Sequence, residues 1–111
     1  MKTEMEFWYD PNHTGALRII DHNKGLIYGS DPKEPYWIVS FEALKKDTLI
    51  VDFHNKKTHH GKKMLSTKYE DRNMTLHWED GNKWRRMKQD PQILLNKITV
   101  HSHSKEIHLN Y

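Results

Sequence analysis

Apolar and polar residues alternate with a period of two along most of the chain, in short runs that end at Asp, Asn, Gly or Pro. This alternation is typical of half-buried β-strands, and the residues between the runs are those that form tight turns. We therefore expect an all-β protein of about seven to nine short strands. The clearest runs are residues 5–9, 15–20, 25–29, 36–41 and 48–54, followed by a longer stretch over 62–88.

Turn residues give three of the hairpins a predicted register. Residues 21–24 form a turn followed by Gly25, which supplies a positive φ. A two-residue turn at Asp71 and Arg72 makes one face of the next hairpin almost wholly apolar, and a three-residue loop over 80–82 continues that face. The predicted cross-strand pairs are Leu65–Trp78, Tyr69–Met74 and Trp78–Trp84.

The end of the chain has a different pattern. Asp90 is suited to cap a helix with Pro91 at its first position, which predicts one short helix over 91–97. Alternation resumes after it and predicts a C-terminal hairpin that completes the segment 91–111. The whole chain, 1–111, is expected to be a single β domain: a small antiparallel meander that closes into a barrel, or a compact sandwich as the alternative.

Residues 62–88 support the barrel. Trp78 and Trp84 bracket a turn of sequence Glu-Asp-Gly-Asn, and in this respect the stretch resembles a late hairpin of the small lipocalin-like (calycin) β-barrels. The resemblance implies a barrel fold, and it assigns no binding residues to this chain.

Composition makes the core small and aromatic. Hydrophobic residues are 35% of the chain and charged residues 30%, so the core depends on four Trp, five Tyr and three Phe. Cysteine is absent, which excludes disulfides, thiolate metal sites and thiol nucleophiles. The N-terminus is acidic, and no stretch approaches the ~20 apolar residues of a membrane span. We expect a cytoplasmic protein that does not enter a membrane.

Positive charge gathers in one predicted loop. The formal net charge is +3 with nine His counted as neutral, so an anionic partner is favoured: a nucleotide, a nucleic acid or an acidic protein surface. Tyr9, Tyr28 and Tyr36 are the side chains that would stack on bases. A solvated loop that keeps edge strands apart is the alternative interpretation. The candidate anion-binding residues are Lys56, Lys57, His59, His60, Lys62 and Lys63, extended by Arg85 and Arg86.

A second candidate site lies in the predicted C-terminal hairpin. Two imidazoles at positions i and i+2 of a strand share a face, and a cross-strand partner completes a three-His zinc site with an open coordination position. The same residues would otherwise form the wet face of a hairpin. The candidate metal ligands are His101, His103, Glu106 and His108.

The sequence contains no Gly-x-Ser-x-Gly motif and no Gly-rich phosphate loop, so we expect binding rather than catalysis. The leading hypothesis is a non-catalytic binding module without a cofactor, a viral or accessory adaptor or inhibitor in type, that holds an anionic partner. One alternative is a small zinc-dependent enzyme built on the C-terminal His residues. Another is a lipocalin-like carrier whose aromatic residues line a pocket for a small hydrophobic ligand. The sequence leaves a homodimer and other protein partners open.

Overall fold

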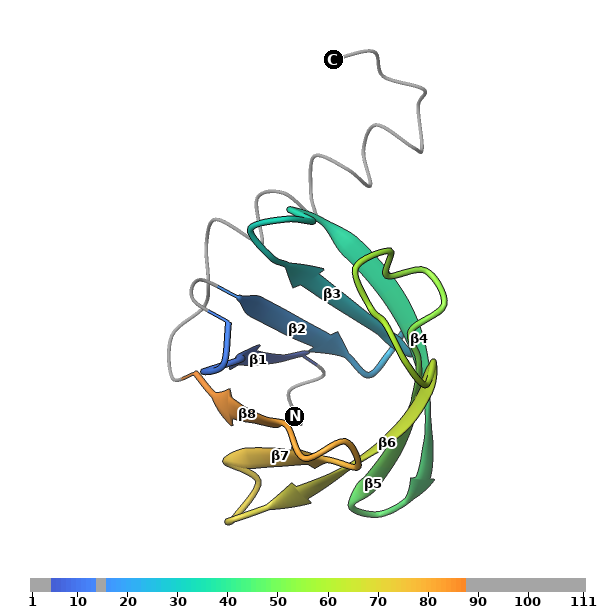
Figure 1. Cartoon of the computed structure of the whole chain (residues 1–111). Coiled ribbons are helices and arrows are strands. Elements are labelled where there is room, and N and C mark those ends of the chain that lie inside the picture. The colour runs from blue at the N-terminus through green and yellow to red at the C-terminus, as the bar shows by residue number, and fades with distance from the viewer. Residues whose placement is uncertain (1–4, 14–15, 88–111) are drawn as a thin grey trace.

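A computed structural model describes residues 5–13 and 16–87, which form a closed antiparallel barrel (Figure 1). Each strand pairs with the next along the chain, and the last pairs with the first. The strands are β1 (Met5–Tyr9), β2 (Leu17–Asp21), β3 (Leu26–Ser30), β4 (Trp37–Lys45), β5 (Thr48–Asp52), β6 (Met64–Glu70), β7 (Thr75–Trp78) and β8 (Lys83–Arg86). The predicted all-β antiparallel barrel is confirmed, and the sandwich is wrong. The predicted helix 91–97 and the C-terminal hairpin lie outside the described residues.

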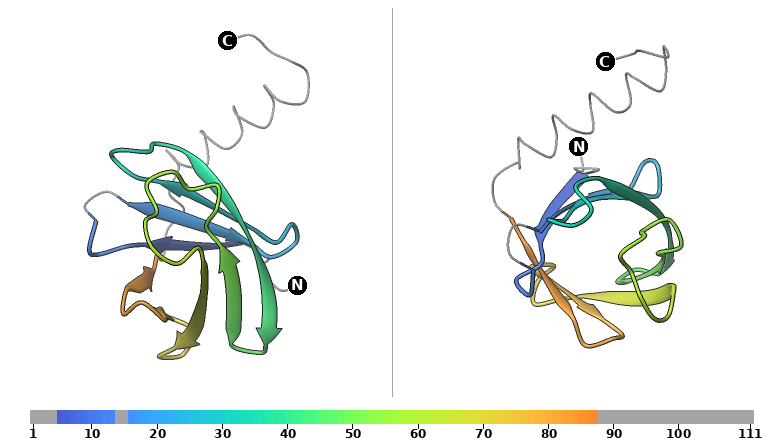
Figure 2. Two further views of the ribbon diagram at one scale, coloured as in Figure 1. Left: turned by 45° about the vertical axis from the view of Figure 1, so that its right-hand side comes forward. Right: turned by 45° about the horizontal axis from the view of Figure 1, so that its top comes forward.

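Closure of the barrel pairs β1 with β8, where Trp8 lies opposite Arg86 and Tyr9 opposite Arg85. The right-hand view of Figure 2 looks into the ring of strands. Closure leaves no strand edge of the ring unpaired, which removes the exposed backbone groups at which sheets aggregate. The turn predicted after β2 is present, with Gly25 at a φ of +65°.

The interior is packed by inward-facing side chains from every strand. All four Trp residues belong to this core, as expected of a polar chain with few aliphatic residues. Phe41 and Tyr69 pack against it. The buried members are Trp8, Ile20, Ile27, Trp37, Val39, Leu49, Val51, Phe53, Leu65, Leu76, Trp78 and Trp84.

The predicted register of the β6–β7 hairpin is wrong by two residues. Thr67 lies opposite Trp78, and Tyr69 lies opposite Leu76, so Met74 is left exposed in the turn. The turn is longer than predicted because residues 71–73 all adopt positive φ, at 55°, 56° and 65°. An offset of two keeps every side chain on its predicted face, since strand side chains alternate with a period of two.

The β7–β8 hairpin carries the same kind of offset. Trp84 lies opposite Leu76 rather than Trp78. The two indoles are diagonal neighbours on the inner face, with ring centroids 4.6 Å apart. The predicted indole contact therefore exists although the predicted direct pairing is wrong.

The two ends of the barrel differ. The connections β1–β2, β3–β4, β5–β6 and β7–β8 meet at one end, which we call the mouth. The opposite end is plugged by the Glu6 carboxylate, which accepts hydrogen bonds from Trp8 Nε1 (3.1 Å), Tyr69 Oη (2.6 Å) and His22 Nε2 (2.9 Å). Burial raises the pKa of Tyr69, and the neighbouring Glu6 raises it further. Tyr69 is therefore a neutral donor that helps to satisfy Glu6.

Candidate functional site

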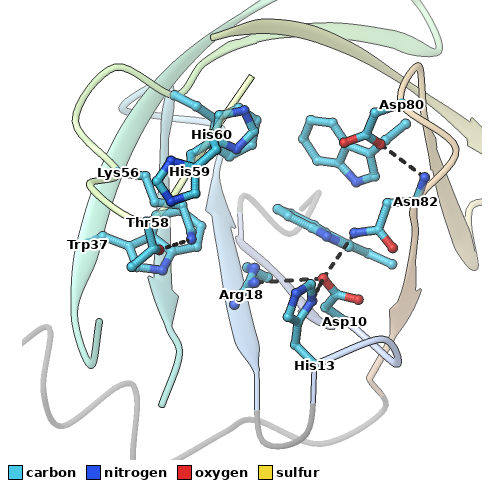
Figure 3. A pocket seen from close by; sticks show the side chains of 13 residues that line it. Asp10, His13, Arg18, Trp37, Lys56, Thr58, His59, His60, Asp80 and Asn82 are labelled. Atoms are coloured by element: carbon cyan, nitrogen blue, oxygen red, sulfur yellow. Dashed lines mark hydrogen bonds and ion pairs between the residues drawn. The ribbon is translucent and has the colours of Figure 1, made fainter. Parts of the chain in front are cut away.

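A cavity of about 210 Å³ opens at the mouth (Figure 3). Its walls come from the ends of several strands and from connections that are distant in sequence. In Figure 3, His59 and His60 lie across the opening from Asp80 and Asn82, with Arg18 between the two sides. The cavity thus brings together aromatic rings, imidazoles and a buried guanidinium.

Arg18 forms the centre of the site. The strand alternation that turns Ile20 into the core also turns Arg18 inward, where it is buried. Its guanidinium lies over two indole rings, 4.8 Å from the centroid of Trp37 and 5.1 Å from that of Trp84. Burial lowers the pKa of Arg18, and nearby carboxylates oppose that shift. A guanidinium remains charged in this setting, so the site holds a fixed cation.

Two carboxylates neutralise this cation. Arg18 Nη2 lies 2.9 Å from Asp31 Oδ1 and 3.9 Å from Asp10 Oδ2. Asp31 also accepts a hydrogen bond from Trp37 Nε1 at 2.9 Å and pairs with Lys56 Nζ at 3.2 Å. Burial raises the pKa of Asp31, but Arg18 and these donors outweigh it and lower the pKa overall. Asp31 is therefore ionised at neutral pH.

The β5–β6 connection is fastened to the β3–β4 connection by Glu34. The Glu34 carboxylate accepts hydrogen bonds from the backbone N–H of Lys57 (3.0 Å), and from the N–H (2.9 Å) and hydroxyl (2.8 Å) of Thr58. Burial raises the pKa of Glu34, and the bonds from Thr58 and Lys57 lower it by more. The β5–β6 connection, which carries the predicted basic loop, is therefore held in one place against the β3–β4 connection.

Three imidazoles surround the cavity. His59 stacks on Phe53 with centroids 4.6 Å apart, and its Nε2–H donates to the carbonyl of Lys62 (2.7 Å). His13 Nδ1 donates to the buried Asp10 Oδ2 at 2.8 Å. His60 is exposed at the rim. Because His13 and His59 each use one ring nitrogen to fix the ring, the other nitrogen is available to a ligand.

Two buried donors of residues in the wall have no acceptor among the described residues. Trp78 is 5% exposed, and its Nε1 is buried without a hydrogen-bond partner among the residues that the structure describes. The great majority of buried N–H groups in proteins have a hydrogen-bond partner, because an unpaired one costs about 1–3 kcal/mol of stability. The Nε of Arg18 is in the same state. Both residues line the cavity.

The predicted basic patch is divided by the structure. Lys56, His59 and His60 line the cavity. The Lys63 ammonium donates to the carbonyl of His59, and Lys62 Nζ pairs with Glu79 Oε2 at 3.1 Å. The Lys57 side chain is exposed. Three of the four predicted lysines, Lys56, Lys62 and Lys63, therefore pair with groups of the protein itself.

The two predicted arginines lie on β8, outside the β5–β6 connection. Arg85 is exposed on β8. Arg86 lies toward the plugged end, where Nη1 donates to the Asn73 carbonyl (3.3 Å) and the guanidinium lies 5.4 Å from the Trp8 ring centroid. Of the tyrosines expected to stack on bases, Tyr9 is exposed whereas Tyr28 is buried and Tyr36 half-buried.

The predicted metal ligands His101, His103, Glu106 and His108 lie outside the described residues. Within residues 5–13 and 16–87, no group of three His or carboxylate side chains is arranged to hold a metal ion.

Sequence reasoning missed Arg18, Asp10 and Asp31. A signal was present, because Arg18 interrupts an apolar run and each Asp stands between a strand and a Pro. An Asp before Pro at a strand end is typical of a turn, so the sequence pattern did not indicate that either Asp pairs with Arg18.

No family model, characterised protein or solved structure matches this chain. The closed eight-stranded meander is compatible with a calycin-like fold in general. The part of the chain that the structure describes contains no helix of the length and apolarity needed to cross a membrane.

Proposed function

We propose that this protein is a non-catalytic binding module that holds a small anionic ligand at the mouth of the barrel. The observation that carries the proposal is the buried Nε1–H of Trp78, a residue that lines the cavity, which has no acceptor among the described residues. A carboxylate or phosphate oxygen is the acceptor that gains most from such a donor, because hydrogen bonds to charged groups are stronger than neutral ones.

The size of the cavity limits the ligand. Pockets for drug-sized molecules have about 300–1,000 Å³, and this cavity has about 210 Å³. A single ring bearing one acidic group fits this volume, and a larger molecule would extend out of the mouth. The indoles and Phe53 supply flat apolar walls for such a ring.

The charges around the cavity favour an anion with one or two negative charges over a polyanion. Arg18 and Lys56 are already paired with Asp31, so they offer little free positive charge. The imidazoles of His13, His59 and His60 are the groups left to meet the ligand. A ring nitrogen donates to an anion only when it carries a proton, so these imidazoles do not supply a fixed full charge. A ligand that needs many cations should therefore bind this cavity weakly.

The packed interior supports the same choice. Twelve buried residues fill the barrel, and four of them, Trp37, Phe53, Trp78 and Trp84, also form the floor of the cavity. A carrier of a hydrophobic molecule would need space among them, whereas a ligand at the mouth uses the space already present. The lipocalin-like carrier is accordingly a weaker proposal than the anion site.

Calorimetric titration of the untagged protein with benzoate, phenyl phosphate and adenosine monophosphate tests the proposal. We expect at least one of the single-ring anions to bind, and Trp78→Phe to weaken it by about 10-fold to 100-fold, the value of one charge-assisted hydrogen bond. His77→Ala is the matched control on the same strand, outside the cavity, and should bind as the wild type does. The proposal is wrong if no anion binds, or if Trp78→Phe, shown to be folded by circular dichroism, binds unchanged.

The salt dependence separates this proposal from nucleic-acid binding. A ligand with one or two negative charges should lose little affinity between low and moderate salt. A polyanion that displaces many counter-ions loses affinity steeply. Steep salt dependence with an oligonucleotide, together with no binding of the single-ring anions, would favour the basic loop over the cavity.

A further inference from the structure

The outer surface of the barrel carries an apolar stripe on four adjacent strands. Phe7 lies opposite Ile19, Ile19 opposite Tyr28, and Tyr28 opposite Ile38. These positions alternate with core residues such as Ile20 and face away from the interior. The stripe therefore forms a second hydrophobic cluster, separate from the core.

The stripe is wider than the four paired residues. Met5, Leu17, Leu26 and Tyr36 pack against Ile19 and Tyr28 in the same cluster. Ile19 is 0% and Tyr28 4% exposed, values that are typical of an interior rather than of the outside of a barrel. We call this surface the outer apolar face.

The outward positions of the other strands are mostly polar, such as Ser66 and Lys68 on β6 and Lys83 and Arg85 on β8. Ile50 on β5 and Met64 on β6 also face outward, but they lie opposite Ser66 and Asp52, respectively. Soluble proteins rarely leave a contiguous apolar surface in contact with water, and such a surface marks an interaction site. The gathering of apolar residues on β1–β4 therefore indicates a specific covering partner.

The chain itself leads to this face. The backbone N–H of Met87, the last residue described, donates to the carbonyl of Phe7 at 2.7 Å. The residues that follow thus begin beside β1, the strand that carries one edge of the stripe. Their sequence is rich in the side chains that an apolar surface binds: Ile93, Leu94, Leu95, Ile98, Val100, Ile107 and Leu109.

We propose that the C-terminal segment, residues 88–111, packs on the outer apolar face of its own barrel. The length is sufficient in any conformation. Four strands spaced ~4.8 Å apart span about 15 Å, and even a helical chain advances ~1.5 Å per residue, which gives about 36 Å for the whole segment. The covalent link at Met87 also gives the segment a high effective concentration at this face over a free partner. This inference is independent of the ligand at the mouth.

Paramagnetic relaxation tests the proposal in the full chain. The protein has no Cys, so Ser102→Cys accepts a single nitroxide label without further changes. We expect the label to broaden the amide resonances of Ile19, Tyr28 and Ile38. The amides of Ser66 and Lys68, on the other side of the barrel, should stay sharp.

Two further samples make the result decisive. Adding Leu94→Asp and Leu95→Asp to the labelled chain should restore the sharp signals, because it removes apolar contact without changing the label. A mixture of isotope-labelled protein without nitroxide and unlabelled protein with nitroxide reports contacts between molecules. Broadening in that mixture would show that the C-terminal segment of a second copy covers the face. Sharp signals in every sample would show that the segment does not lie on the face, which would then bind another partner. Either result overturns the proposal.

Discussion

Gly29 lies directly opposite Trp37 across the β3–β4 pair, and a Cβ at position 29 would lie 2.0 Å from Cζ2 of that indole. The indole therefore rests on the bare backbone of β3. From this position it covers the Arg18 guanidinium and donates to Asp31. The missing side chain of Gly29 therefore leaves the space in which the Trp37 indole contacts Arg18 and Asp31.

Gly29→Ala should destabilise the fold by about 1–3 kcal/mol, the usual cost of forcing extra atoms into a packed site. Urea unfolding followed by circular dichroism measures the change. The cost should shrink in a Trp37→Leu background, because a smaller side chain leaves room for the methyl group. Equal costs in the two backgrounds would show that the indole contact is not the cause.

Arg18→Met should cost about 3–5 kcal/mol in the free energy of unfolding, since it removes the buried cation from the Asp10 carboxylate and leaves Asp31 with Lys56 as its remaining ion-pair partner. Adding Asp31→Asn to this variant should recover part of the loss by removing one of the two carboxylate charges that faced Arg18. Denaturant unfolding at neutral pH measures both variants. A double variant no more stable than Arg18→Met would contradict the ionic account.

The protein should lose stability in acid because of Glu6 and Asp31. Burial raises the pKa of Glu6, but hydrogen bonds from His22 and Tyr69 and the charges of His22 and Arg86 lower it below its ordinary 4.5. A carboxyl with a lower pKa in the folded state binds fewer protons than the unfolded chain does. Its stabilisation is therefore complete above pH 4.5 and is lost as the pH falls through the folded-state pKa.

Glu6→Gln tests this dependence, since it keeps an acceptor for Tyr69 but cannot titrate. The variant should be less stable than the wild type at neutral pH, and the difference should narrow as the pH falls below about 4.5. Thermal unfolding at a series of pH values measures the narrowing. A difference that stays constant down to the acid limit would exclude Glu6 as a contributor.

Arg72→Gly should stabilise the protein by about 0.5–1 kcal/mol. Arg72 has a φ of +56° in the β6–β7 turn, and a left-handed conformation costs an L-residue about 1–2 kcal/mol that glycine avoids. Part of this gain is offset by the greater flexibility of glycine in the unfolded chain. Arg72→Ala is the control and should not stabilise; a gain of the same size with Ala would show that charge, not backbone strain, is responsible.

Asp80→Asn should tighten the binding of benzoate or phenyl phosphate by about 3-fold. Asp80 is exposed at the rim of the cavity, where its Oδ1 accepts the N–H of Asn82 at 3.0 Å. Removing one negative charge about 6 Å away in water is worth ~0.7 kcal/mol to an anion. The gain should fall with added salt. An unchanged affinity at low salt would mean that the anion binds elsewhere.

The hydrophobic pattern was sufficient to predict the barrel but not the register of its last hairpins. Alternation determines which side chains face inward, so Leu65, Leu76 and Trp78 were placed on the correct face. It cannot distinguish registers that differ by two residues, because both give the same faces. The difference lies in the backbone of Asp71, Arg72 and Asn73, whose positive φ values are not signalled by a glycine.

The candidate site was only partly predictable for a related reason. The cluster of Lys and His residues identified the β5–β6 connection as one wall, and Lys56, His59 and His60 do line the cavity. The remaining wall depends on which strand ends meet at the mouth. That proximity follows from barrel closure between β1 and β8, which no local pattern encodes.

The indole ¹H–¹⁵N resonance of Trp78 tests the central claim most directly. The four Trp residues give four such signals. The indole N–H groups of Trp8 and Trp37 already donate hydrogen bonds to Glu6 and Asp31. Titration with phenyl phosphate or benzoate should move the Trp78 signal downfield as its N–H acquires an acceptor, while the signals of Trp8 and Trp37 change little. A Trp78 signal that stays in place at saturating concentrations of both anions would contradict the proposal that the mouth of this barrel is an anion-binding site.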